Sequence, residues 1–178
     1  MKIAILGTSG SGKSTLAKQL GEQYGAPVLH LDAVHFLPGW VERTQEEETA
    51  LVRRFLDEHD SWVIDGNYTK TCYERRLEEA DQIIVLWFNR FVCLQRVLKR
   101  WWENRGQVRD SSAAGCEEKI DLAFVRWVLY EGRSKQKYLR MKAIGKQYPE
   151  KFVMIENNRE LKQWILGSPF GRAVCEAD

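Results

Sequence analysis

The chain has 178 residues, of which 44% are hydrophobic and 29% are charged, and its formal net charge is +2. These proportions are typical of a folded globular domain, so they exclude a disordered or fibrous chain. Because the net charge is small, attraction to a polyanion would have to come from a local cluster of basic residues. The four cysteines lack a paired spacing, which favours reduced thiols over a zinc site or a disulfide framework.

Apolar runs alternate with amphipathic segments along the chain. Five runs have the length and composition of buried strands, and in chain order they span residues 2–6, 27–31, 61–65, 82–88 and 151–156. The segments between and after them have helical spacing, and they span residues 12–25, 44–59, 73–80, 90–104, 117–148 and 158–167. This alternation predicts an α/β fold in which helices flank one parallel sheet.

Polar residues mark the ends of several predicted helices. Thr44 and Glu47 form a capping box, and the acidic run 46–48 is expected to occupy the first helical turn rather than to bind a metal. Asn158 is expected to cap the last helix. Residues 1–167 then form a single domain, and residues 168–178 are expected to be a tail.

The chain carries no pattern that directs it to a membrane. The N-terminal apolar run stops at Gly7 without the features of a signal peptide, and no apolar stretch has the length of a membrane span. We therefore expect a cytoplasmic protein with no membrane partner.

Residues 7–14 read GTSGSGKS and match the phosphate-binding pattern G-x-x-x-x-G-K-[ST]. Glycines let the main chain curl so that its N–H groups point at an anion, and the following helix adds its positive end. In this pattern Lys13 reaches the β- and γ-phosphates, and the Ser14 hydroxyl ligates Mg²⁺. The strand before the loop and the helix after it favour an ATP site over a Gly/Ser-rich turn without a ligand. The predicted ATP-binding residues are Gly7, Thr8, Ser9, Gly10, Ser11, Gly12, Lys13, Ser14 and Thr15.

Three features favour a small kinase among proteins with this loop. The chain is short, it has no N/T-K-x-D motif for guanine, and its arginines gather after the fourth predicted strand. The basic segment 91–109 also contains Trp101 and Trp102, a combination that suits contact with single-stranded nucleic acid. Its apolar residues recur at helical spacing, however, which favours a helix that packs on the domain and presents arginines to a nucleotide.

On these motifs the sequence resembles the nucleoside monophosphate kinases, adenylate kinases in particular. SWVIDGNY is similar to their third strand, which ends in Asp-Gly, and LWFNR…LQRVLKR is similar to their fourth strand and the arginine-bearing helix before the lid. A closer resemblance, over nearly the whole chain, is to the adenylate-kinase-like proteins called FlaR-type DNA topology modulation proteins. It rests on GTSGSGKST, HLDAVHFLPGW, DGNYTKTCYERRLEEAD and FNRFVCLQRVLKR.

The resemblance implies a P-loop NTPase fold with strand order 2-3-1-4-5 and an arginine-bearing lid over about residues 101–125. It also implies roles for charged residues. Asp65, at the end of the third strand, would hold Mg²⁺ through water. Arg96 and Arg100 would flank the bound ATP, and Arg126 and Arg133 would close on the transferring phosphoryl group. Fixed cations lower the barrier there because negative charge spreads over the phosphoryl oxygens.

The acceptor is expected to dock in the region of about residues 32–60, because ligands in open α/β sheets lie beyond the carboxyl ends of the strands. Asp32 is similar to the aspartate with which shikimate- and gluconate-type kinases accept or orient the attacking hydroxyl, and a turn cap is the alternative. His35, Phe36 and Trp40 either line an acceptor pocket or form a covering loop. His30 is expected to be a buried strand residue. The predicted catalytic residues are Lys13, Asp32, Arg100, Arg126 and Arg133, and the predicted metal ligands are Ser14 and Asp65.

One departure from the adenylate kinases concerns the acceptor. They follow Asp-Gly with Phe-Pro-Arg, whereas this chain has Asn67-Tyr68-Thr69, so the arginine that holds the acceptor phosphate is absent. Lys70 and Arg75 are the candidate substitutes. The main hypothesis is transfer of the ATP γ-phosphoryl group to a small nucleotide, nucleoside or other hydroxyl or phosphate compound. ATP hydrolysis and a nucleic-acid-associated role in DNA topology are the alternatives, although no helix-turn-helix or zinc finger is recognisable.

Overall fold

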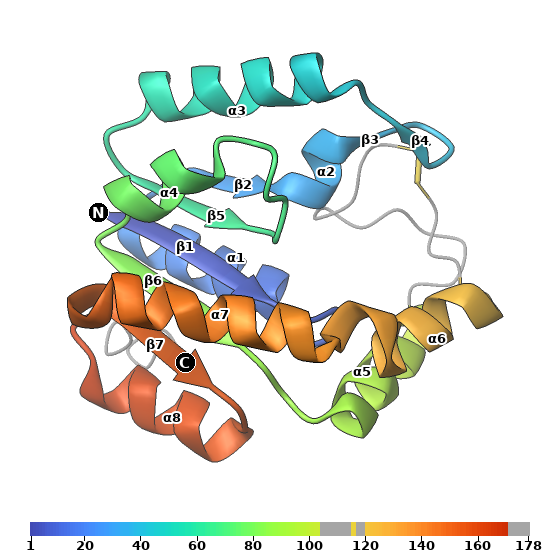
Figure 1. Cartoon of the computed structure of the whole chain (residues 1–178). Helices are drawn as coiled ribbons and strands as arrows, with labels where there is room; N and C mark the ends of the chain where they lie inside the picture. The colour runs from blue at the N-terminus through green and yellow to red at the C-terminus, as the bar shows by residue number, and fades with distance from the viewer. Residues whose placement is uncertain (104–114, 117–119, 171–178) are drawn as a thin grey trace.

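The computed structural model describes residues 1–103, 115–116 and 120–170. Its centre is a parallel sheet (Figure 1) made of β1 (Lys2–Gly7), β2 (Val28–His30), β5 (Trp62–Asp65), β6 (Gln82–Leu86) and β7 (Phe152–Ile155). Their order is β2-β5-β1-β6-β7, and each neighbouring pair is parallel. These labels differ from the expected numbers because two further strands form a separate hairpin. Counted within the sheet alone, the order is 2-3-1-4-5.

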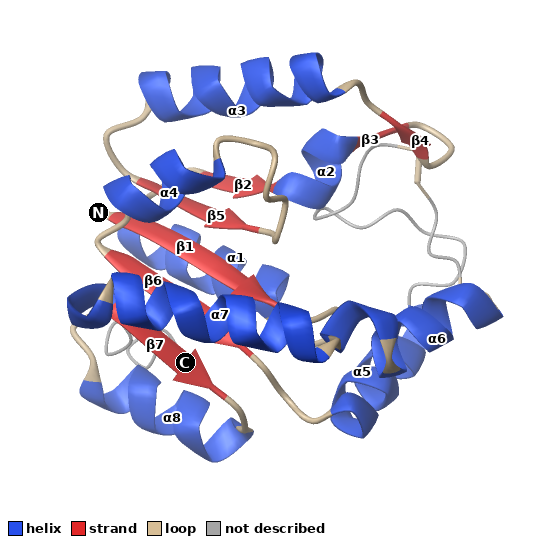
Figure 2. Ribbon diagram, in the orientation of Figure 1, coloured by secondary structure: helices blue, strands red, loops and turns tan. Residues whose placement is uncertain are grey.

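Helices cover both faces of the sheet (Figure 2) and create two apolar clusters. The first cluster joins the sheet to α1 (Lys13–Tyr24), α5 (Arg90–Glu103), α6 (Leu122–Leu129) and α8 (Asn158–Gly167). The second joins it to α2 (Leu31–His35), α3 (Gln45–Glu58), α4 (Tyr73–Glu79) and α7 (Lys135–Gln147). Along β1, Ile3 and Ile5 belong to the first cluster, and Ala4 and Leu6 to the second. A strand buried on both faces reads as a continuous apolar run, and the predicted α/β fold is confirmed.

The start of α3 confirms the predicted cap and the predicted position of the acidic run. The Thr44 side chain accepts a hydrogen bond from the Glu47 main-chain N–H and donates one to the Glu47 carboxylate, so this capping pair is present. Glu46 and Glu47 are exposed, as first-turn residues should be. Glu48 is only 2% exposed, however, because it lies on the face of the helix that packs against the domain. All three glutamates therefore lie in the first turn, as predicted, and Glu48 in addition is buried against the domain.

The long helix predicted over residues 117–148 is interrupted. Residues 117–119 lie outside the described part of the chain, and the rest forms α6, a 3-10 turn η1 (Glu131–Arg133) and α7. Asp121 caps α6 and Ser134 caps α7, each with a side-chain oxygen that accepts a main-chain N–H. Since each cap satisfies donors that only a helix start leaves free, two helices form instead of one.

The last helix has its cap one residue earlier than predicted. The Asn157 side chain accepts the Glu160 main-chain N–H at 3.0 Å, and α8 begins at Asn158. Most of the predicted lid (about 101–125) and of the tail (168–178) lies outside the described residues. Within the described part of the chain, no helix combines the length and apolar character needed to cross a membrane.

The segment after β2 contains elements that the sequence did not predict. Leu31 begins the short helix α2 instead of ending the strand, and an antiparallel hairpin follows, formed by β3 (Phe36–Leu37) and β4 (Val41–Glu42). The hairpin turn is formed by Gly39 and Trp40, both with positive φ. This segment borders the carboxyl ends of the sheet strands, and it forms one side of the candidate site.

Candidate active site

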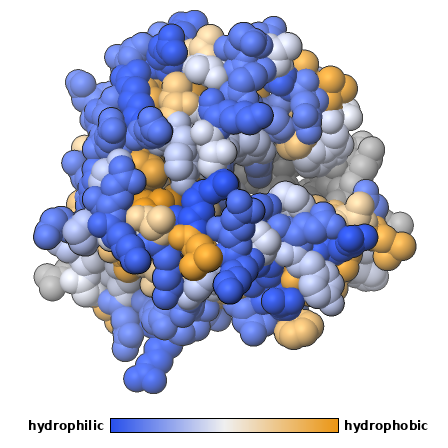
Figure 3. Space-filling view, in the orientation of Figure 1, coloured by the Kyte–Doolittle hydropathy of each residue, from blue (hydrophilic) through white to orange (hydrophobic). Residues whose placement is uncertain are grey.

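A cleft of about 1950 Å³ opens at the carboxyl ends of the strands. The surface is hollowed between the region of α2 and the region of α6 and α7 (Figure 3). The loop after β1 lines one side of this cleft, and α2 and the β3–β4 hairpin line another. Ligand pockets usually measure about 300–1,000 Å³, so the cleft has room for a nucleotide and a second small molecule.

The loop of residues 7–14 connects β1 to α1, which is the context that the phosphate-binding pattern requires. Gly7, Gly10 and Gly12 have φ values of 143°, 75° and 97°, which side chains rarely tolerate. At Gly10, a Cβ atom would also collide with the main-chain carbonyl of Cys93 in α5. All three glycines are therefore required by conformation, and Gly7 and Gly10 are required by packing as well, since a Cβ at Gly7 would collide with the Leu86 carbonyl.

The phosphate-binding loop is held by its neighbours in the sheet. The Gly7 N–H donates to Asn67 Oδ1 at 2.9 Å, and Asn67 Nδ2 donates to the Gly7 carbonyl at 2.6 Å. The Thr8 N–H donates to the carbonyl of Leu86 at 3.3 Å. The Asn67 side chain thus bonds to both main-chain groups of Gly7, as the main chain of a neighbouring strand would. Asn67 is also one of the residues that depart from the adenylate kinase pattern.

Three residues predicted to act on phosphates and metal, Lys13, Ser14 and Asp65, lie close together, and His30 contacts one of them. Lys13 Nζ donates to the Thr8 carbonyl at 3.1 Å, so the lysine folds back over the loop. The Ser14 hydroxyl donates to Asp65 Oδ2 at 2.8 Å, and His30 Nδ1 lies 2.5 Å from Asp65 Oδ1. His30 is therefore an orienting contact of the carboxylate as well as a strand residue.

Ser14 and Asp65 fit a Mg²⁺ ion. They offer a hydroxyl and a carboxylate oxygen, which are the hard donors that Mg²⁺ prefers, and phosphates and waters usually complete its shell. The Asp65 side chain is almost fully buried, so its position is well defined. Among the described residues, no cluster of three or more His, Cys, Asp or Glu side chains suggests another metal site.

The four predicted arginines occupy different surroundings. Arg96 and Arg100 line the cleft, and Arg96 donates to the Ser11 carbonyl and to Asn158. Arg133 lies behind the loop, where it donates to Thr8 Oγ1 at 2.9 Å and to the Phe88 carbonyl at 2.7 Å, and burial lowers its pKa. Arg126 is 75% exposed and pairs with Glu131 outside the cleft. The structure thus brings Arg96 and Arg133 into contact with the loop, places Arg100 in the lining of the cleft and leaves Arg126 apart.

Two cations of α7 were not predicted as site residues. Lys137 and Arg140 both line the cleft, one helical turn apart. Burial lowers the pKa of Lys137, whose ammonium lies 3.8 Å from the centre of the Trp127 ring. In the sequence, only their spacing of three residues could have indicated that these two cations share a helix face. Such pairs are common on solvated helix faces, so the spacing does not predict a binding site.

On the opposite side of the cleft, Asp32 is paired with Tyr68. The Tyr68 hydroxyl donates to Asp32 Oδ1 at 2.7 Å. Burial, together with the nearby Asp32 carboxylate, raises the pKa of Tyr68 above its ordinary value, so the phenol remains a donor. The Phe36 main-chain N–H bonds to the Asp32 carbonyl, but among the described residues the Asp32 carboxylate accepts no main-chain N–H, as a turn cap would.

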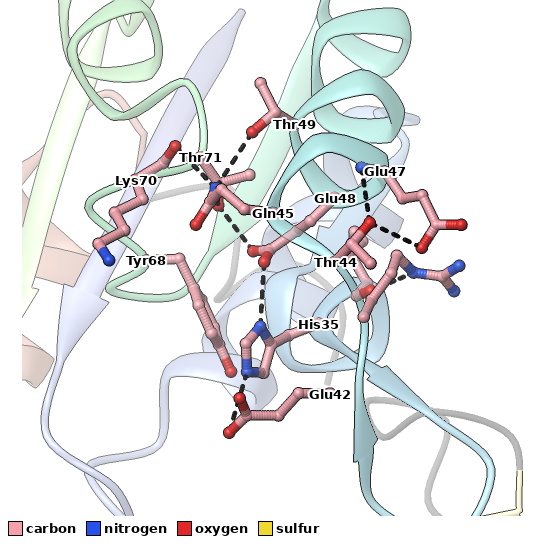
Figure 4. A network of polar contacts seen from close by, with 12 residues as sticks. His35, Glu42, Thr44, Gln45, Glu47, Glu48, Thr49, Tyr68, Lys70 and Thr71 are labelled. Atoms are coloured by element: carbon pink, nitrogen blue, oxygen red, sulfur yellow. Dashed lines mark hydrogen bonds and ion pairs between the residues drawn. The ribbon is translucent and has the colours of Figure 1, made fainter.

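A network of side chains supports this side of the cleft (Figure 4). His35 Nδ1 lies 3.0 Å from Glu48 Oε2, and the Thr71 hydroxyl donates to Glu48 Oε1 at 2.7 Å. The Gln45 amide donates to the Lys70 carbonyl at 3.0 Å. These contacts join α2, α3 and the loop after β5, which are far apart in the sequence.

Arg76 holds the loop after β5 from the interior of the domain. This side chain is fully buried, and it donates to the carbonyls of Gly66, Tyr68 and Thr71. Burial lowers its pKa to about 10. Of the two candidate substitutes for the missing acceptor arginine, Lys70 lines the cleft, whereas Arg75 pairs with Asp57 and Glu79 outside it.

The strand–loop–helix unit and the strand order define a P-loop nucleotide-binding protein of the α/β class. A family model described as an AAA domain matches residues 3–115 of the chain. This match spans more than half of the sequence, so the chain belongs to that AAA domain family. No curated protein sequence matches it.

Several solved structures are similar. A shikimate kinase from Acinetobacter baumannii in complex with shikimate has 18% identity and a TM-score of 0.53, with 93% of this chain and 92% of that chain covered. A gluconokinase from Sinorhizobium meliloti 1021 has 19% identity and a TM-score of 0.46, with 99% and 88% covered. A sugar kinase from Janibacter sp. HTCC2649 has 16% identity and a TM-score of 0.44, with 99% and 91% covered. At 18% identity, the similarity to the shikimate kinase shows that the two chains share a fold and nothing beyond the fold.

Proposed function

We propose that the protein is a small-molecule kinase that transfers the γ-phosphoryl group of ATP to a hydroxyl of a small acceptor. One observation carries the proposal. Asp32, a candidate proton acceptor, lies in the same cleft as Lys13 and Ser14 of the phosphate-binding loop. The AAA domain family and the fold shared with a shikimate kinase support a nucleotide-binding enzyme with a second, small ligand.

The phosphates of ATP would lie against the main-chain N–H groups of residues 7–14 and the first turn of α1. Lys13 would exchange the Thr8 carbonyl for a phosphate oxygen. Ser14 and Asp65 would hold Mg²⁺, which neutralises part of the phosphate charge when it is bound. His30 would keep the Asp65 carboxylate oriented through its contact with Oδ1.

Asp32 would accept the proton of the acceptor hydroxyl. Tyr68 occupies its Oδ1 atom, so Oδ2 is the oxygen assigned to the proton. The acceptor oxygen forms a bond to the γ-phosphorus while the bond from that phosphorus to the bridging oxygen breaks, and ADP leaves with the electron pair. The proton on Asp32 passes to solvent after the phosphorylated product departs.

Cations in the cleft would stabilise the charge of the transferring group. In this arrangement we assign that role to Arg100 and Lys137, which line the cleft. The contacts of Arg133 instead fix the loop from behind, and Arg126 is paired with Glu131. The roles implied for Arg126 and Arg133 on the phosphoryl group would therefore require α6 and η1 to move.

The finer resemblances concern the acceptor and the cellular role. The resemblance to the adenylate kinases implies that the acceptor is a nucleotide. The resemblance to the FlaR-type proteins implies an effect on DNA topology. Arg96 of the basic helix α5 is turned toward Ser11 and Asn158 rather than away from the domain. This favours a nucleotide-facing role of the helix over a nucleic-acid-binding surface.

The test is ADP release from Mg–ATP with a panel of nucleosides, nucleotides and small alcohols. We expect release that depends on one class of acceptor and is abolished by Lys13→Ala. Release at the same rate without any acceptor would mean that the protein is an ATPase. Tight, salt-sensitive DNA binding without phosphoryl transfer would instead support the nucleic-acid-associated role.

A further inference from the structure

His35 and Glu48 form a hydrogen-bonded pair in which the donor and the acceptor can be assigned. Glu48 is buried, and its two oxygens contact two partners, His35 Nδ1 at 3.0 Å and the Thr71 hydroxyl at 2.7 Å. A carboxylate can only accept hydrogen bonds. His35 therefore carries a proton on Nδ1 and donates it to Glu48, so that Nε2 is the ring atom that the cleft can use.

The His35 ring is held in one orientation by its neighbours. Its centre lies 4.6 Å from the centre of the Phe36 ring and 4.6 Å from that of Tyr68. Nε2 is 3.8 Å from Glu42 Oε1, which is beyond hydrogen-bond distance. His35 lines the cleft next to Asp32, the candidate proton acceptor. The pair thus presents a fixed hydrogen-bonding atom to whatever occupies this side of the cleft.

The charges around this atom are unfavourable for an anion. The carboxylates of Asp32, Glu42 and Glu48 lie on this side of the cleft. Lys70 and Arg43 also line the cleft, but the Lys70 side chain extends away from His35 (Figure 4), and Arg43 is tied through Nε to the Val34 carbonyl. Carboxylates repel a phosphate or carboxylate, whereas they accept hydrogen bonds from hydroxyl and amine groups.

Aromatic side chains complete this side of the cleft. The rings of Phe36 and Trp40 meet edge to face with their centres 5.2 Å apart, and both line the cleft. Such rings bind a flat or apolar ligand face and also attract a cation. The side chains here therefore suit a ligand that has hydroxyl groups and an apolar face.

We infer that the phosphoryl acceptor is a hydroxyl compound that carries no phosphate or carboxylate group. This inference rests on the proposed kinase function and narrows it. A hydroxyl of the acceptor donates to His35 Nε2, and the apolar face of the acceptor packs on Phe36 and Trp40. Glu48 is a positioning residue, because it acts on the acceptor only through His35.

The acceptor class is tested with matched pairs that differ by one anionic group: adenosine and AMP, cytidine and CMP, glucose and gluconate, and choline and phosphocholine. Each is incubated with Mg–ATP, and ³¹P NMR separates a newly phosphorylated compound, either a phosphate ester or a phosphoanhydride, from inorganic phosphate; with AMP the product is ADP, so consumption of AMP is followed. We expect a phosphorylated product, an ester, only with the member that lacks the anionic group. A phosphorylated product formed preferentially from AMP, CMP, gluconate or phosphocholine would overturn this inference and leave the kinase function standing. Inorganic phosphate alone from every pair would overturn the kinase function and this inference with it.

The role of His35 is tested with His35→Asn. The Asn amide reproduces the Nδ1–H donor to Glu48, so the fold is retained, but nothing replaces Nε2. With the preferred acceptor of the panel, we expect KM for that acceptor to rise about tenfold, the loss of roughly one hydrogen bond, while KM for ATP stays unchanged. An unchanged acceptor KM, or an equal rise for ATP, would contradict the assignment.

His59→Asn is the matched control. His59 also uses Nδ1, which lies 2.8 Å from the Phe55 carbonyl, and it packs on the Phe55 ring at the end of α3. It does not line the cleft, so both KM values should stay unchanged. The ¹⁵N spectrum of the histidines provides a readout independent of activity. The signal lost in His35→Asn should show a protonated Nδ1, and a proton on Nε2 alone would overturn the argument.

Discussion

The two sides of the cleft are built in different ways. On the nucleotide side, the loop of residues 7–14 is shaped by the main chain: three glycines with positive φ, contacts with Leu86 and Cys93, and the start of α1. On the acceptor side, α2 and the loop after β5 are held by side chains, above all Glu48 and Arg76.

This difference has a physical consequence. A site made of main-chain groups needs only a short segment with the right conformation, so it leaves a continuous motif in the sequence. A site made of side chains can draw its members from distant elements, so its pattern is spread along the chain. The nucleotide side should therefore respond most to changes of backbone conformation, and the acceptor side to loss of buried polar groups.

The largest expected effect comes from Gly10→Ala. The new Cβ would collide with the Cys93 carbonyl, and the positive φ of 75° would add strain. We expect the free energy of unfolding to fall by about 3 kcal/mol or more, measured by urea denaturation. Gly39→Ala is the counterpart on the acceptor side, since φ is 78° but no atom lies within 4 Å of the new Cβ. It should cost about 1 kcal/mol. If both variants lost the same free energy of unfolding, close packing would not distinguish the nucleotide side of the cleft from the acceptor side.

Lys13→Ala should remove ATP binding without changing the fold. For the wild type, ATP at about 100 times its Kd should raise the free energy of unfolding by about 2.7 kcal/mol. In the variant this increase should vanish, because the fixed positive charge over the loop is lost. Lys162→Ala, an exposed lysine of α8, should retain the increase. Retained stabilisation in Lys13→Ala would refute the assignment of the loop.

Arg76→Met tests the side-chain construction of the acceptor side. It removes the donors to three carbonyls of the loop after β5, so we expect a loss of about 2 kcal/mol of stability. The KM for the acceptor should rise, whereas ATP should still stabilise the variant, because the hydrogen bond from Thr8 to Leu86 does not depend on Arg76. The Asn67 clamp on Gly7 should loosen in part, since Asn67 lies between the Gly66 and Tyr68 carbonyls that Arg76 holds. Arg54→Met, an exposed arginine of α3, is the control. An equal loss of ATP and acceptor affinity would show that the two sides are one unit.

Glu79→Gln tests a pair outside both sides of the cleft and should have the smallest effect. The hydrogen bond from Lys2, followed by that from Arg75, lowers the pKa of Glu79. The resulting stability is present above the unfolded-state pKa and is lost as pH falls through the lowered folded-state pKa. The wild type should exceed the variant by less than about 1 kcal/mol at pH 7, since the pair is near the surface. The difference should disappear in urea titrations near the acid limit, and a difference that grows with acidity would contradict this sign.

Local patterns predicted much of the fold and of the nucleotide side. The five strands, the phosphate-binding loop and the Thr44 cap each depend on residues adjacent in the sequence. The sequence did not reveal that Glu48 turns inward, because its neighbours Glu46 and Glu47 are exposed and all three satisfy the same helix-start pattern. Nor did it show that Asn67 clamps Gly7, sixty residues away in the chain.

The sequence by itself determined the α/β architecture and the position of the phosphate-binding loop, because hydrophobic periodicity and glycine conformation are local properties. Only the tertiary structure decided which charged groups face the cleft. It brought Ser14 to Asp65 and His35 to Glu48, and it placed Arg126 outside. Such contacts depend on how helices from both faces meet at the strand ends, and no spacing within a single segment encodes that arrangement.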